Sequence, residues 1–210
     1  MSKQKKPTEE QMDYLGEMMN IGAGNAATAL SQLLNCQVEL NLPMVHLLPS
    51  AEEVASIMAG SAETIVCVRM QMLGDITGQV LFVVSHEHQR ALVKFLKTNF
   101  PKNLTKLIRV DTTIIEEIAN VITGVFLTAL HDFSQVSICH TVPVMTVETI
   151  RTLVEECTSS LGPREILVIE SEFIVKQAEV KTILFLIPVL KSLDTLIASI
   201  DAARAGIGAA

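Results

Sequence analysis

Apolar and polar positions follow the same order of patterns in both halves of the chain. Each half begins with apolar residues at spacings of three and four, which predict a long amphipathic helix. A short strand ending at a proline, a second helix, two apolar strands rich in β-branched residues and a last helix are expected to follow. The predicted elements are helices over about 9–34, 50–59 and 87–98, strands over 63–72 and 76–85, then helices over about 105–133, 146–159 and 191–204 and strands over 165–175 and 180–190.

This order reflects an internal repeat at an offset of 100 residues. The segment Glu17–Gly24 aligns with Glu117–Gly124, and Pro43 recurs as Pro143. A few inserted residues shift the offset later in the chain, because Leu81-Phe82 matches Leu184-Phe185. A repeat of this length indicates a duplicated structural unit.

The repeat predicts an α+β fold. We expect a pseudo-two-fold duplicated unit with one shared, mainly antiparallel sheet and two long helices that carry the active sites. Neither half can bury enough surface alone, so residues 1–210 are expected to form a single domain made of two repeats, about 9–98 and 105–204. The linker Asn99–Asn103 marks the boundary between them, and Gly74-Asp75 predicts a hairpin turn.

The two long helices carry the candidate functional residues on the side opposite their apolar stripe. At about 100° per residue, the first helix places Asp13, Glu17, Asn20 and Gly24 on one face. The second helix repeats this stripe with Thr113, Glu117, Asn120 and Gly124. Both stripes are therefore expected to face solvent or a partner.

The glycine in each stripe has two possible explanations. A glycine inside a helix costs about 1 kcal/mol relative to alanine, so its occurrence at the same place twice needs a reason. Either Gly24 and Gly124 allow the backbone of another protein to approach, or they pack closely against this chain.

The Glu–Asn pairs point to a particular chemistry. A single exposed pair is usually a solvated face, but these pairs persist while neighbouring surface positions differ, as with Gln11 and Asp111. A carboxamide can orient a water, and a carboxylate seeks a cation. The set lacks a strong nucleophile, so it suits attack by water on a group that is already activated.

Composition excludes several classes of function. The chain has 16 Lys and Arg against 23 Asp and Glu, for a net charge of −7, which argues against nucleic-acid binding. No apolar run reaches the roughly 20 residues that span a bilayer, and no signal peptide begins the sequence. We expect a cytoplasmic protein without membrane insertion.

The four cysteines predict no metal site of this chain's own. Cys36, Cys67, Cys139 and Cys157 are far apart, without a C-x-x-C pair. We expect reduced core residues in a cytosolic protein.

The motif Asp13-x3-Glu17-x2-Asn20-x22-Pro43 resembles the signature of the CheC / CheX / FliY chemotaxis phosphatases. The second copy fits this signature with one departure, since Thr113 stands where Asp or Ser is usual. Two copies in about 200 residues are similar to the two-site CheC type.

The resemblance implies that this bacterial protein hydrolyses the phospho-aspartate of CheY, a response regulator in two-component signalling. By carry-over, Asn20 and Asn120 orient the attacking water, and Glu17 and Glu117 anchor the regulator by pairing with its lysine. Asp13 and Thr113 support or contact the partner, and the second site is expected to work more weakly. The resemblance implies no cofactor of the chain's own, since Mg²⁺ belongs to the regulator.

The resemblance also implies CheD, a receptor deamidase, as a second partner. The candidate surface is the predicted helix Thr146–Ser159, with apolar Ile150, Leu153 and Val154. An amphipathic helix that covers the sheet explains the same pattern without a partner, so both interpretations stay open.

Two other functions remain as alternatives. The first is a non-catalytic adaptor that binds CheD or a CheY-like regulator. The second is a carboxylate-pair hydrolase such as a glycosidase, which requires Glu17 and Glu117 to converge on one cleft. Aromatic residues, on which sugars stack, make up only 4% of the chain, and this argues against a sugar-binding cleft.

Overall fold

The computed structural model describes residues 7–58, 64–99, 111–158 and 166–207, and all structural statements concern these ranges. Its elements are α1 (Glu9–Leu34), β1 (Val38–Leu40), β2 (Met44–Leu48), α2 (Ala51–Met58), β3 (Thr64–Gly74), β4 (Gly78–Ser85), α3 (His86–Asn99), α4 (Asp111–Ser134), β5 (Ile138–His140), β6 (Val144–Thr149), α5 (Ile150–Thr158), β7 (Ile166–Val175), the 3₁₀ turn η1 (Lys176–Ala178), β8 (Val180–Pro188) and α6 (Leu190–Ile207). The predicted α+β class is confirmed. The predicted boundary Asn99–Asn103 lies almost entirely outside the described residues.

Local sequence signals account for the ends of α1. The Thr8 side chain accepts a hydrogen bond from the Gln11 backbone N–H, and the Gln11 side chain accepts one from the Thr8 N–H, which forms a capping box. The helix ends where Asn35 adopts the left-handed conformation (φ 46°). The first long helix therefore has the bounds that the sequence predicts.

The eight strands form one sheet in which the two halves exchange strands. The order along the sheet is β1-β7-β8-β4-β3-β5, while β2 also pairs with β7 and β6 with β3. All pairings are antiparallel, so the short strands of each half complete the long hairpin of the other. The shared antiparallel sheet is confirmed.

The repeat centre lies in the middle of this sheet, where β4 pairs with β8. Leu81 is opposite Phe185, and Phe82 is opposite Leu184. The repeat aligns Leu81 with Leu184 and Phe82 with Phe185, so the two pairings are equivalent and are related by a pseudo-two-fold axis. All four side chains are buried.

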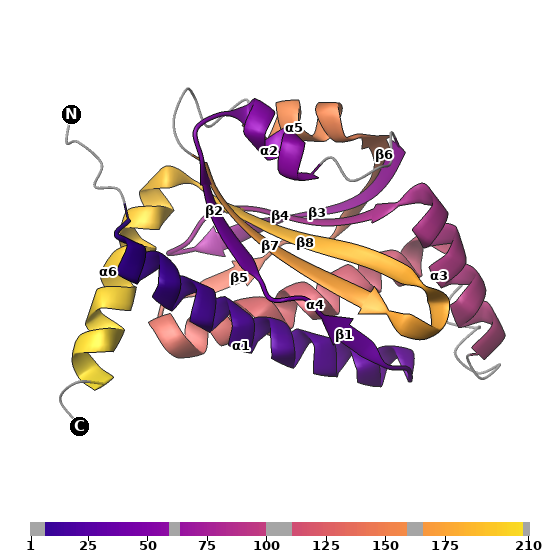
Figure 1. Cartoon of the computed structure of the whole chain (residues 1–210), viewed down its shortest axis with the longest axis horizontal. Helices are drawn as coiled ribbons and strands as arrows, with labels where there is room; N and C mark the ends of the chain where they lie inside the picture. Colours follow the sequence, from indigo (N-terminus) through magenta and orange to yellow (C-terminus); the bar gives the residue numbers. More distant parts are fainter. Residues whose placement is uncertain (1–6, 59–63, 100–110, 159–165, 208–210) are drawn as a thin grey trace.

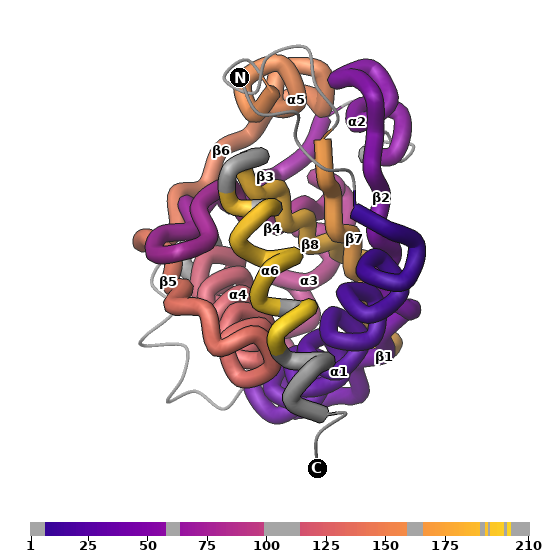
Figure 2. Tube along the Cα trace, turned by 90° about the vertical axis from the view of Figure 1, so that its left-hand side faces the viewer, coloured from indigo at the N-terminus to yellow at the C-terminus, as the bar shows by residue number. Residues whose placement is uncertain are grey.

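Helices cover both faces of the sheet and give a three-layered molecule (Figure 1). On one face, α2 and α5 pack over a smaller apolar cluster that contains Phe185 and Leu153. On the other face, α1 and α4 lie side by side, with α3 and α6 at the ends, over a larger cluster that contains Phe82 (Figure 2). The ring of Phe126 on α4 meets Phe173 on β7 edge-on, with centroids 6.4 Å apart.

The chain after each proline differs from the prediction. Pro43 and Pro143 do not end a strand, because β1 and β5 stop three residues earlier and β2 and β6 begin directly after the prolines. The helix expected over 146–159 consequently begins only at Ile150. Pairing of Val144–Thr149 with β3 explains this difference, since β-branched residues fit a sheet better than a helix.

The turn between β3 and β4 confirms the predicted hairpin. Gly74 has φ 112°, and a Cβ at this position would lie 2.3 Å from the Ser137 carbonyl oxygen, so only glycine fits. The Asp75 carboxylate accepts a hydrogen bond from the Ser137 backbone N–H at 2.8 Å. The turn thereby ties the two halves together beside β5.

One described helix is long and apolar enough to cross a membrane by length and composition. It is Ile114–Ser134 of α4, of which 56% of the most apolar window is buried inside the protein. Its contacts with α1 and the sheet are those of a core helix.

The four cysteines are all free, but the prediction that all four are core residues is wrong. Cys67 and Cys157 are buried, Cys36 is half-buried and Cys139 is exposed on β5. Burial raises the pKa of the Cys67 thiol, and raises that of Cys157 to about 11. Both thiols therefore remain protonated near neutral pH.

Thiol titration should separate these four cysteines. In native protein at pH 8, we expect dithionitrobenzoate to label Cys139 fastest and Cys36 more slowly, because burial also raises the pKa of Cys36. Cys67 and Cys157 should react only when the protein unfolds, so four thiols should be counted in guanidinium chloride. Rapid labelling of all four in native protein would contradict the buried positions. A Cys139→Ser variant identifies the fast phase.

Candidate active sites on two helices

The first candidate site is the outer face of α1. Asp13, Glu17, Asn20 and Gly24 are all exposed. The apolar residues on the opposite side of the helix, among them Met19, are buried against the sheet and α4. The predicted orientation of this stripe is therefore confirmed, although the roles of its residues remain predictions.

The second candidate site is the equivalent face of α4. Glu117 is exposed, while Asn120 and Gly124 are half-buried. Thr113 belongs to α4, but its side chain lies outside the described residues. The second carboxamide is thus accessible, though less than the first.

The functional groups of both sites are available to a partner. Within the described residues, the carboxylates of Glu17 and Glu117 form no ion pair, and the carboxamides of Asn20 and Asn120 form no side-chain hydrogen bond. A free carboxamide can donate to one group and accept from another, and a free carboxylate can receive a cation. The arrangement can bind and position a water beside a positively charged docking group.

The two stripe glycines do not pack against this chain. A Cβ at Gly24 would meet no atom within 4 Å, and one at Gly124 would meet only Nε2 of His140, at 3.8 Å. Close helix packing occurs instead at Gly22, where a Cβ would lie 3.1 Å from that of Ala129 on α4. Of the two explanations left open by the sequence, close packing against this chain is therefore wrong for Gly24 and Gly124.

This difference predicts that alanine stabilises the protein more at Gly24 than at Gly22. Gly24→Ala should raise the free energy of unfolding by about 1 kcal/mol, because alanine favours the helix and nothing obstructs its methyl group. If a partner's backbone approaches Gly24, the same variant should bind that partner more weakly. Gly22→Ala is the control and should gain less stability, because Ala129 must move. Urea denaturation measures stability, and a Gly24→Ala protein less stable than the parent would contradict the open space.

The two sites are separate, which excludes a carboxylate pair in one cleft. α1 and α4 run in opposite directions (Figure 1) and cross where Gly22 meets Phe126 and Ala129. Glu17 lies five residues before this crossing on α1, and Glu117 lies at least nine residues before it on α4. At about 1.5 Å per residue, the two carboxylates are about 20 Å apart along the helix axes. The glycosidase alternative is therefore wrong.

The apolar surface proposed for CheD is not available on α5. Ile150, Leu153 and Val154 are buried in the cluster beneath α2 and α5, with exposed fractions of 8%, 0% and 3%. The helix covers the sheet, which is the interpretation that needs no partner. A partner on α5 would instead contact its outer polar residues, such as Arg151 and Glu155.

A charged cluster that the sequence did not predict lies next to this helix. Arg69 on β3 donates hydrogen bonds to Glu148 (2.6 Å) and Glu156 (2.5 Å). It ties β3 to β6 and α5, and no motif in the sequence signals it.

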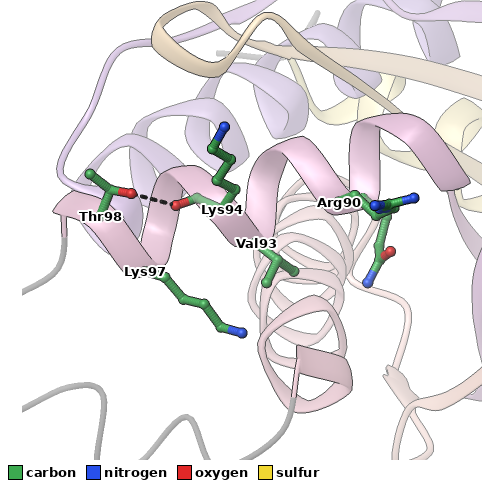
Figure 3. Close-up of a pocket in the computed structure, with 6 residues that line it drawn as sticks. Arg90, Val93, Lys94, Lys97 and Thr98 are labelled. Carbon is green, nitrogen blue, oxygen red and sulfur yellow. Dashed lines mark hydrogen bonds between the residues drawn. The ribbon is translucent and has the colours of Figure 1, made fainter.

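A shallow depression of about 380 Å³ lies along α3 (Figure 3). Its lining includes Arg90, Lys94 and Lys97, and none of its described lining residues is a carboxylate or asparagine. It therefore offers neither group of the Glu–Asn chemistry. Within the described residues, no three His, Cys, Asp or Glu side chains gather closely enough to hold a metal ion.

Comparisons with known proteins agree with the sequence motif. Residues 10–46 match the CheC-like family. The chain is 29% identical over 200 residues to the CheY-P phosphatase CheC of Bacillus subtilis (strain 168), covering 92% of this chain and 95% of that protein.

Solved structures share the fold. The chain resembles FliY of Thermotoga maritima with a TM-score of 0.67 at 16% identity, covering 93% of this chain and 100% of that one. It resembles a chain of the CheX–CheY–BeF₃–Mg²⁺ complex of Borrelia burgdorferi with a TM-score of 0.50 at 16% identity, covering 84% and 98%.

Proposed function

We propose that this chain, a member of the CheC-like family, hydrolyses the phospho-aspartate of a CheY-like response regulator. The observation that carries the proposal is the duplicated Glu–Asn stripe, with both carboxamides accessible and unbonded within the described residues. The relative named a CheY-P phosphatase supports the activity, and the CheX–CheY complex supports a receiver domain as the partner.

The proposed chemistry needs little more than positioning. An acyl phosphate is already reactive, and phosphoryl transfer is catalysed mainly by alignment and charge stabilisation. Asn20 and Asn120 each hold a water in line with the phosphorus atom. Glu17 and Glu117 pair with a lysine of the regulator and fix the orientation of docking. Asp13 and Thr113 contact the partner, and Mg²⁺ is supplied by the regulator as part of the substrate.

The open glycines extend this docking surface. Gly24 and Gly124 lie about one turn beyond the asparagines, and their missing side chains leave room for a partner's backbone. Because the two sites are about 20 Å apart, we propose that they act independently in the cytoplasm. Asn120 is less exposed than Asn20, which makes the α1 site the stronger one.

Phosphate release tests the activity directly. A CheY-like regulator, phosphorylated on its aspartate in Mg²⁺, is mixed with catalytic amounts of the protein, and inorganic phosphate is followed with time. Acceleration above the regulator's own rate supports the proposal. Binding without acceleration would instead support the non-catalytic adaptor, with CheD or the regulator as its partner, and would overturn the phosphatase.

A further inference from the structure

Each helical site has a matching apolar loop beside it. We define the proline tips as Leu42–Met44 and Val142–Val144, which run from the connection after β1 or β5 into the first residue of β2 or β6. In each tip the residues before and after the proline are large, apolar and exposed. Leu42 is 74% exposed and its counterpart Val142 is 79% exposed, while Met44 and its counterpart Val144 are 52% and 55% exposed.

This exposure is concentrated rather than scattered. Of the seven large apolar side chains exposed in the described residues, four flank the two prolines. The side chains differ between the repeats, but their apolar character and exposure agree. Exposed apolar groups gathered at particular places are typical of surfaces that a partner covers.

Hydrogen bonds to β7 and β3 anchor the residue that precedes each tip. In the first tip, the Asn41 backbone N–H donates to the Glu172 carbonyl at 3.0 Å, and the Asn41 side chain also bonds to Glu172. In the second, the Thr141 N–H donates to the Gln71 carbonyl at 3.0 Å, and the Thr141 hydroxyl accepts from the Gln71 N–H. Asn41 and Thr141 are equivalent in the repeat, and proline further restricts each backbone. A partner would therefore meet a surface that is already ordered.

The strands that flank each tip contact the helix that carries the neighbouring stripe. His140, the last residue of β5, comes within 3.8 Å of the position of a Cβ on Gly124. In the first repeat, the connection from β1 to β2 passes over α1 (Figure 1). Ile21, next to Asn20, is 46% exposed and adds apolar surface on α1 itself.

We propose that each proline tip is an apolar docking contact for the receiver domain whose phosphoryl group lies at the neighbouring Glu–Asn stripe. The inference rests on the proposed function and adds a determinant of affinity to it. There is one tip for each stripe. A receiver domain bound at a stripe would therefore contact the neighbouring tip within the same interface. Contact with a second copy of this chain would explain why a tip is apolar and exposed. It would not explain why each of the two stripes has its own tip.

The test is the double variant Leu42→Ser plus Val142→Ser. We expect KM for the phosphorylated regulator to rise about tenfold, with kcat unchanged, because an apolar contact that is equal in the bound state and the transition state affects binding alone. The dissociation constant for the regulator with Mg²⁺ and BeF₃ should rise by the same factor. Leu42→Met plus Val142→Ile should restore both values.

The matched control is Val147→Ser. Val147 is 58% exposed on β6 but lies three residues beyond Val144, so the two side chains point to opposite faces of that strand. This variant should leave KM unchanged. Both variants alter exposed side chains, and thermal melting should confirm that they fold like the parent.

The outcomes separate the two proposals. Unchanged KM and dissociation constant in the tip variant would overturn the docking role, even with a fully active enzyme. A wild-type protein that binds the regulator without hydrolysis would overturn the phosphatase, while weaker binding by the tip variant would still support the tips. A concentration-dependent dimer that is lost in the tip variant, with KM unchanged, would assign the tips to a second copy and overturn the proposal.

Discussion

Replacing both Asn20 and Asn120 with alanine is expected to lower the rate of phospho-aspartate hydrolysis about 100-fold, to near the regulator's own rate. The alanine side chains remove the groups that orient the attacking water, and loss of such positioning costs about this factor. Phosphate release under single-turnover conditions measures the effect. Binding to the regulator should persist, because Glu17 and Glu117 remain in place.

The matched control for this variant is Asn25→Ala. Asn25 is an exposed asparagine on the same helix, but it points away from the stripe. Its removal should leave the rate unchanged. If the Asn20→Ala plus Asn120→Ala protein hydrolyses at the parent rate, the water-orienting role of the carboxamides is wrong.

The single variants compare the two sites. Asn20→Ala should remove more activity than Asn120→Ala, since Asn20 is exposed and Asn120 is half-buried. Equal losses would contradict this ranking without affecting the chemistry. The rates of the two single variants should add up to that of the parent, because the sites are separated by about 20 Å.

Phe82→Ala should produce the largest loss of stability. Phe82 is fully buried beside the pseudo-two-fold axis, opposite Leu184, and truncation of such a residue costs about 3–5 kcal/mol. Urea denaturation followed by circular dichroism measures the change. Phe133→Ala, at a half-buried position near the end of α4, is the control and should cost less.

The same experiment tests whether the two repeats form one domain. Because β1 and β2 complete the sheet of the second half and β5 and β6 that of the first, both halves should unfold in one transition. Labelling of Cys67 and Cys157, one buried thiol from each half, should follow the same urea dependence. Separate transitions would contradict the single domain.

The sequence predicted the elements correctly where the spacing of apolar residues matches the face that is buried in the fold. The period of apolar residues predicted α1 and the outward direction of its stripe, and the offset of 100 residues predicted the shared sheet. The local pattern predicts the start of a helix where β6 forms, because the pairing of β6 with β3 joins residues about 80 positions apart. The burial of Ile150, Leu153 and Val154 was likewise decided by what lies beneath α5, which periodicity cannot specify.

By itself, the sequence determined the duplication, the long helices and the residue types on their outer faces, because helical periodicity depends only on near neighbours. Only the tertiary structure decided that the halves exchange strands, that Gly24 is open while Gly22 is packed, and that the apolar residues flanking Pro43 and Pro143 are exposed. These features depend on contacts between distant segments, and such contacts leave no signature in the local spacing of residues.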